Sequence, residues 1–129
     1  MNADYTTKIV QSSRELSVKE RIALKDICDA TSLDDAVQPG DTLLIAPEEF
    51  VELAIHNEAA KGDKDYTKYV IIDKAGNKYY TGSKTFFRNF IDIWDEMKNE
   101  APDEEFQISV YKIPSKNFAG KHFITCSIV

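Results

Sequence analysis

Cysteine is scarce in this 129-residue chain, which has two that lie far apart in the sequence. Neither belongs to a CxxC pair and no secretory leader pattern opens the chain, so we expect a protein of the reducing cytoplasm. Long apolar runs are also lacking. The longest, such as Leu43–Ala46, span about four residues, against the ~20 that a membrane helix needs. We therefore expect no membrane-spanning segment.

Sequence motifs of catalysis are lacking as well. The chain has no Gly-rich phosphate loop, no GxSxG motif and no Cys/His arrangement. His56 and His122 are lone histidines without metal-ligand spacing, so no metal site is expected. The acidic run 92–105 falls at a helix end and in a loop, where it is typical of a solvated face. We expect no enzymatic activity and no cofactor.

The composition that is present is ordinary for a globular protein, with 43% hydrophobic, 11% aromatic and 29% charged residues. A chain of this length can bury enough surface to fold as one compact unit without cross-links. Its net charge of −6 is unevenly distributed. Residues 64–91 carry six bases against two acids, and residues 106–129 carry three bases and no acid. Two basic segments therefore lie inside an acidic protein.

These two basic segments also hold 11 of the 14 aromatic residues. Surfaces for unpaired nucleic acid combine the same groups, because cations follow the phosphates and each ring that stacks on a base contributes ~1–3 kcal/mol. The rings could equally form a core with lysines at its rim, and the acidic net charge disfavours a polyanionic partner. Both interpretations stay open at this point.

The first 41 residues are expected to form an N-terminal extension with one helix. Ser17 and Glu20 have the spacing of a capping box, and the apolar positions after them predict a helix over about 17–28. Before it, residues 7–11 alternate in polarity, as an edge strand or an arm would.

Residues 42–129 are expected to form the main domain, which begins with a strand. Pro39–Asp41 has turn chemistry, and residues 42–45 predict a strand after it. Pro47, with two glutamates behind it, could begin a helix. The apolar residues at odd positions up to Ile55 favour instead one long strand that bends at Pro47.

Two hairpins and a helix complete the main domain. Strands 67–73 and 78–81 form the first hairpin, residues 83–98 an amphipathic helix, and strands 106–111 and 123–128 the second hairpin. The order is β-β-β-α-β-β, which is that of a mainly β, five-stranded OB-fold barrel. Such a barrel binds oligonucleotides on its second and third strands and on the loops that follow its first and fourth strands.

The chain resembles the small single-stranded-DNA-binding proteins of Gram-positive phages and conjugative plasmids. The resemblance covers mainly residues 64–129 and rests on three features: Val70-Ile71-Ile72-Asp73-Lys74-Ala75-Gly76-Asn77-Lys78-Tyr79-Tyr80, then Ser83-Lys84, and the hairpin Phe106–Val129. It implies an OB fold, sequence-independent binding of single-stranded DNA without a cofactor, and a role in replication or transfer.

Candidate contacts to the nucleic acid are the lysines and rings of the basic segments. Tyr111 and Phe123 are expected on the polar faces of paired strands, and Phe118 in a loop whose only apolar sequence neighbour is Ala119. The full set is Lys68, Tyr69, Lys74, Lys78, Tyr79, Tyr80, Tyr111, Lys112, Lys116, Phe118, Lys121 and Phe123.

The expected partner is single-stranded DNA, with RNA as a further possibility, and the extension 1–41 could mediate self-association along the strand. The alternative function is a protein-protein interaction module on an OB-like barrel, with an apolar interface. Affinity that falls steeply with salt would indicate the first function, and affinity indifferent to salt the second. An enzyme of unrecognised type is the third and weakest interpretation.

Overall fold

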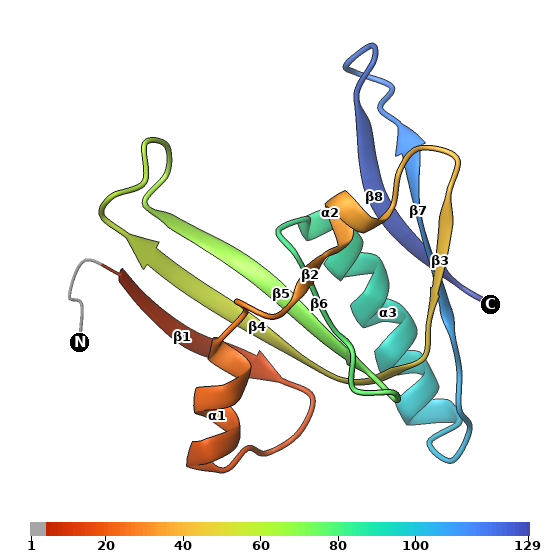
Figure 1. Ribbon diagram of the computed structural model, residues 1–129. Coiled ribbons are helices and arrows are strands. Elements are labelled where there is room, and N and C mark those ends of the chain that lie inside the picture. The colour runs from red at the N-terminus through yellow and green to blue at the C-terminus, as the bar shows by residue number, and fades with distance from the viewer. Residues whose placement is uncertain (1–4) are drawn as a thin grey trace. The chain divides into compact units, whose positions relative to one another are not determined.

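The computed structural model describes residues 5–129, which form eight strands and three helices (Figure 1). Strands hold 42% of the residues and helices 23%, so the expected mainly β class is confirmed. The chain forms two compact units. The first contains the residues up to Thr31 and residues 48–82, and the second contains residues 32–47 and 83–129. This division differs from the expected one at residue 41, because each unit takes residues from both sides of it.

The first unit is built on a sheet with the strand order β1-β4-β5-β6-β2. Its strands are β1 (Tyr5–Ser12), β4 (Pro47–Asn57), β5 (Asp65–Asp73), β6 (Lys78–Thr81) and the two-residue β2 (Thr31–Ser32). Helix α1 (Val18–Lys25) places Leu24 in the core of this unit. The buried residues around it are Val51, Leu53, Ile55 and Val70. Alternate positions of β4 thus form the apolar face that the sequence pattern predicts.

Helix α1 begins as the sequence predicts and ends earlier. Ser17 Oγ accepts a hydrogen bond from the Glu20 amide at 3.2 Å, and Glu20 Oε1 accepts one from the Ser17 amide at 3.0 Å, which confirms the capping box. At the other end, Asp26 Oδ1 accepts from the Cys28 amide at 2.9 Å. This local bond replaces the next helical turn, so the helix stops short of the expected residue 28.

The expected edge strand or arm at residues 7–11 is an edge strand. β1 pairs antiparallel with β4, from Tyr5 opposite Asn57 to Ser12 opposite Val51, with a bulge between Ile9 and Gln11. Residues 5–12 are therefore part of the sheet, and the expectation that residues 1–41 form a helical extension needs this correction. The expectation failed because the alternating pattern was too short to predict its pairing partner; residues 1–4 lie outside the described residues.

The long strand expected across Pro47 is divided into two. β3 (Thr42–Ile45) and β4 are separated by Ala46 alone, yet they belong to different sheets. Proline has no backbone N–H to donate, so the ladder is interrupted where Pro47 begins β4. The alternative helix at Pro47 is wrong.

The second unit contains an antiparallel sheet of order β3-β7-β8 and helix α3 (Lys84–Glu100), which packs against β8. β7 spans Ile108–Pro114, β8 spans His122–Ile128, and the short helix α2 spans Leu33–Ala36. Ser83 Oγ accepts from the Phe86 amide at 3.1 Å and so caps α3 near the expected start. The rings of Phe86 and Phe90 are fully buried, which confirms the apolar stripe as core.

Neither sheet closes on itself within residues 5–129, and the sheets are mixed and antiparallel. Within the same residues, no helix is long and apolar enough to cross a membrane.

Candidate nucleic-acid interface

The turn between β5 and β6 fixes which side chains of the first basic segment share a face. Asp73 Oδ1 accepts from the amides of Ala75 at 3.0 Å and Asn77 at 2.8 Å. Gly76 has a φ of 89°, which residues with a side chain rarely adopt. The resulting register pairs Val70 with Tyr80.

Of the three candidate tyrosines in this hairpin, one is buried. Tyr69 is only 6% exposed, so its ring cannot receive a base and the prediction for it is not supported. Tyr79 and Tyr80 are both half-buried and, as neighbours in a strand, lie on opposite faces. Tyr80 packs against the core cluster of the first unit.

Lys68 is positioned between two aromatic rings. Its Nζ lies 5.4 Å from the ring centroid of Tyr80 and 5.9 Å from that of Tyr66. Both distances allow a cation–π interaction, which holds the ammonium over the rings. Tyr66 was not among the predicted contacts, although its position two residues before Lys68 in the same strand places both on one face. A cation and two rings thus gather on the β5–β6 hairpin.

Two other lysines of this segment have structural partners. Lys78 Nζ donates to the carbonyl oxygens of Asp26 at 3.0 Å and Ala23 at 3.3 Å, and lies 3.3 Å from Asp29 Oδ1. The predicted phosphate contact of Lys78 is therefore not supported, because its ammonium group is hydrogen-bonded to carbonyl oxygens at the end of α1. Lys74 Nζ pairs with Glu48 Oε2 at 2.9 Å; it is more exposed and would have to exchange that partner for a phosphate.

The second basic segment places Tyr111 and Phe123 on one face of the β7–β8 pair. Tyr111 is opposite Thr125 and Phe123 is opposite Ile113, so the two rings are diagonal neighbours. The Tyr111 hydroxyl lies 2.6 Å from Ser127 Oγ, on the side away from Phe123. Both rings are half-buried. The expected shared face is therefore present, and Tyr111 and Phe123 lie diagonally across it.

Lys112 points to a different part of the second unit. Its Nζ donates to the carbonyl oxygen of Asp34 in α2 at 2.6 Å. This bond ties β7 to α2, and the predicted phosphate contact of Lys112 is not supported. This bond could not be predicted from the sequence, because α2 is a single helical turn without a clear sequence pattern.

The loop between β7 and β8 presents the most exposed ring among the candidates. Phe118 is 66% exposed. Two backbone hydrogen bonds close the loop. The Ser115 amide donates to the Lys121 carbonyl oxygen at 2.9 Å, and the Lys121 amide donates to the Phe118 carbonyl oxygen at 3.1 Å. Gly120, with a φ of 78°, allows the tight return. Lys116 and Lys121 flank the ring and are exposed, and neither forms an ion pair among the described residues.

The ionisable groups around these segments have identifiable environments. Burial, with a smaller contribution from Asp73, raises the pKa of Tyr79, so its hydroxyl stays neutral. His56 lies beside the β4–β5 loop, with Nδ1 2.7 Å from Asp65 Oδ1 and Nε2 2.6 Å from Glu58 Oε1. These two carboxylates raise the pKa of His56. Across residues 5–129, no three His, Cys, Asp or Glu side chains are grouped as a metal ion would require.

Comparison with known proteins gives no match: no protein-family model, no curated protein and no solved structure is significantly similar to the chain. The geometry of the two basic segments therefore carries the functional proposal.

Proposed function

We propose that this protein binds single-stranded DNA without sequence preference and coats it, through cations and stacked rings. The observation that carries the proposal is Phe118, an exposed ring at the tip of a hairpin whose loop holds Lys116 and Lys121 and which contains no acid. Leaving a phenylalanine in water has no benefit for folding. A base that stacks on it would remove that ring from water while the two lysines meet the adjacent phosphates.

We further propose that the fold is an opened form of the OB fold. The support is the pairing pattern: β4-β5-β6 in one sheet, β3-β7-β8 in the other, and β3 joined to β4 through Ala46. Together, β3 and β4 correspond to the first strand of the OB fold. Strands β5 and β6 correspond to its second and third strands, and β7 and β8 correspond to its fourth and fifth. In the order of the chain, helix α3 comes between the third and fourth strands, as in that fold. The β7–β8 loop then corresponds to one of the two loops that bind oligonucleotides.

Seven of the twelve candidate residues have a role in this proposal. Phe118 stacks on a base at the loop, and the face of Tyr111 and Phe123 offers further stacking. Lys116 and Lys121 neutralise phosphates. In the first unit, Lys68 over Tyr80 forms a second point of contact. The residues Tyr69, Lys78 and Lys112 are left out, because they are buried or engaged elsewhere.

The proposed mechanism needs no covalent chemistry and no cofactor. Release of counterions from the phosphates drives binding and makes it sensitive to salt. Coating is a role that the resemblance of residues 64–129 to phage and plasmid proteins suggests, in replication or transfer. We also propose that the protein self-associates along the strand and binds RNA.

The proposed location is the cytoplasm, which fits the two free thiols, Cys28 and Cys126.

The experiment is fluorescence anisotropy of a labelled ~30-nucleotide poly-dT and of its duplex form, across a salt series. We expect tight, salt-sensitive binding to the single strand only. Phe118→Ala is expected to weaken it ~5- to 100-fold, the equivalent of one lost stack. Val18→Ala, which shortens an equally exposed apolar side chain on α1, is the matched control and should bind as the parent protein does.

Charge variants give the second arm. Lys116→Gln and Lys121→Gln should each reduce the slope of log affinity against log salt by about 0.7, the value for one phosphate of a single strand. Lys19→Gln, on the exposed surface of α1, should leave the slope unchanged. Binding that is indifferent to salt, or absence of binding at low salt, would sink the proposal and favour the protein-interaction module.

A further inference from the structure

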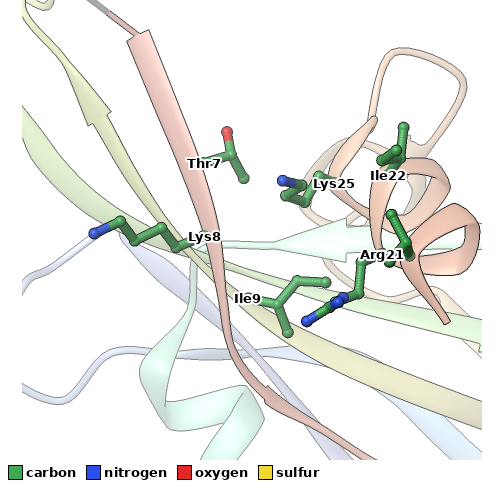
Figure 2. Close-up of a pocket in the computed structure, with 7 residues that line it drawn as sticks. Thr7, Lys8, Ile9, Arg21, Ile22 and Lys25 are labelled. Carbon is green, nitrogen blue, oxygen red and sulfur yellow. The ribbon is translucent and has the colours of Figure 1, made fainter. Parts of the chain in front are cut away.

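A groove separates the edge strand β1 from helix α1 in the first unit (Figure 2). Its volume is about 430 Å³, and its walls are Thr7–Ile9 of β1 and Val18, Arg21, Ile22 and Lys25 of α1. A second hollow of about 380 Å³ shares Thr7, Lys8 and Lys25 and extends along β1 to Tyr5. The groove therefore runs beside the strand over the five residues from Tyr5 to Ile9.

The helical wall is one continuous face of α1. Its four residues are spaced i, i+3, i+4 and i+7, which places them in a single stripe. Leu24 points to the core instead. Val18 and Ile22 in the stripe are each 62% exposed, although both are aliphatic. This face of α1 thus combines two exposed aliphatic side chains with the cations Arg21 and Lys25, and no part of the described chain covers Val18 or Ile22.

The strand wall has a free backbone edge. β1 is the last strand in its sheet, so among residues 5–129 no strand pairs with its outer side. Such an edge presents unpaired N–H and C=O groups to another chain. The bulge between Ile9 and Gln11 interrupts the regular ladder, which limits regular pairing to the segment Tyr5–Ile9.

The groove is positively charged in an acidic protein. In Figure 2, Arg21 and Lys25 extend from α1 toward β1, and Lys8 points to the other side of the strand. None of the three forms an ion pair within residues 5–129, and no acid lines the groove. By contrast, Arg14 nearby in sequence is paired with both Glu20 and Glu49. Within residues 5–129, Arg21 and Lys25 thus have no carboxylate partner that would compete with an anionic ligand.

We propose that the groove binds an acidic, partly aliphatic segment of a partner protein, which adds to β1 as an extra antiparallel or parallel strand. The free edge supplies main-chain hydrogen bonds, Val18 and Ile22 receive aliphatic side chains, and Arg21 and Lys25 pair with carboxylates. A nucleic acid is a poorer occupant, because the seven residues between β1 and α1 include no ring on which a base could stack. Tyr5 is the only ring that lines either hollow among residues 5–129, and it lies at the far end of the second. The proposal is independent of DNA binding by the β7–β8 hairpin.

The test is selection from a displayed library of random decapeptides on the immobilised full-length protein. We expect enrichment of sequences that combine Asp or Glu with Val, Ile or Leu. One enriched peptide, synthesised with a fluorophore, should bind Lys25→Glu about tenfold or more weakly than the parent. It should bind Lys19→Glu normally, because Lys19 is on α1 outside the groove. Hydrogen exchange should slow at the amides of residues 5–9 when the peptide is added.

Several outcomes would overturn the proposal. The first is that the parent protein enriches no peptide more than the Lys25→Glu protein does. The second is that Lys25→Glu and Lys19→Glu bind the peptide with equal affinity. The third is that the peptide does not slow hydrogen exchange in β1. Thermal unfolding of each variant shows whether a loss of peptide affinity is caused by misfolding. Ile22→Ser changes no charge and should lose peptide affinity as Lys25→Glu does. If hydrogen exchange in β1 slows when the protein concentration is raised without peptide, a second copy of the protein occupies the edge. Loss of poly-dT affinity in Lys25→Glu would mean that the groove binds nucleic acid.

Discussion

The ammonium group of Lys78 lies 3.0 Å from the carbonyl oxygen of Asp26 and links strand β6 to the end of helix α1. The last carbonyls of a helix have no intrahelical donor, and a cation placed there also meets the negative end of the helix dipole. The Lys78 side chain is only 16% exposed, so water competes weakly for these acceptors. This contact helps to hold α1 against strand β6 within the first unit.

Replacing Lys78 with Met should therefore destabilise the protein. The variant keeps the aliphatic stem and removes the charged donor, which leaves the helix carbonyls without that partner. We expect the free energy of unfolding to fall by about 1–3 kcal/mol, measured by urea titration of the far-ultraviolet circular dichroism. Poly-dT affinity of the folded protein should not change.

Lys74→Met is the matched control for that measurement. Lys74 belongs to the same hairpin, but its ion pair with Glu48 is solvent-exposed. Such pairs contribute less than about 1 kcal/mol. If the two variants lose equal stability, or if Lys78→Met also weakens poly-dT binding at equal fold, the structural role assigned to Lys78 is wrong.

Tyr111 allows its ring and its hydroxyl to be tested separately. Tyr111→Phe removes the bond to Ser127 and should lower the free energy of unfolding by about 0.5–1.5 kcal/mol, with poly-dT affinity retained. Tyr111→Leu removes the aromatic face and should weaken the affinity ~5- to 100-fold. Anisotropy at fixed salt measures this. Equal affinity of the Leu and Phe variants would exclude stacking at this position.

The local elements of the fold could be predicted because their signals lie within a few residues. Ser17 with Glu20 predicts the start of α1, and the stripe that includes Phe86 and Phe90 predicts α3. Pairing between distant strands could not be predicted, because alternation in polarity shows which face is buried but not which strand is adjacent. The assignment of β1 to the edge next to β4 is the clearest case.

The candidate site was predictable to a similar extent. The sequence around Phe118 left open whether the ring meets a ligand or folds under the loop, and the structure exposes it. The face shared by Tyr111 and Phe123 followed from period-two alternation. Lysine partners were not predictable, because a lysine's long side chain reaches acceptors far away in the sequence. Lys112, which donates to Asp34, shows that a basic segment is not by itself a set of free cations.

The two thiols should differ strongly in reactivity. Cys126 is buried, and burial raises the pKa of its thiol to about 12. Cys28 is exposed, and its hydrogen bond to the Asp26 carboxylate also raises the pKa of its thiol. Since the thiolate is the reactive form, a maleimide at pH 8 should label Cys28 alone in the native protein, and both thiols in denaturant.

Asp26→Asn provides the internal check on that assignment. The amide oxygen can still accept from the Cys28 amide and end the helix, while the negative charge beside the thiol is gone. The rate at which Cys28 is labelled should therefore increase several-fold, and that of Cys126 should not. Mass spectrometry of the labelled protein distinguishes the two sites. Early labelling of Cys126 would contradict its buried position.

His56 should make the stability of the first unit depend on pH. Asp65 and Glu58 accept from its two ring nitrogens and raise its pKa above the ordinary 6.5. A group with a raised pKa in the folded state stabilises it fully below the unfolded pKa, and this contribution is lost as the pH rises through the folded value. The free energy of unfolding from urea titrations should thus fall from pH 6 toward pH 8. His56→Gln should remove this part of the pH dependence, and a variant that keeps the full decline would show that another group causes it.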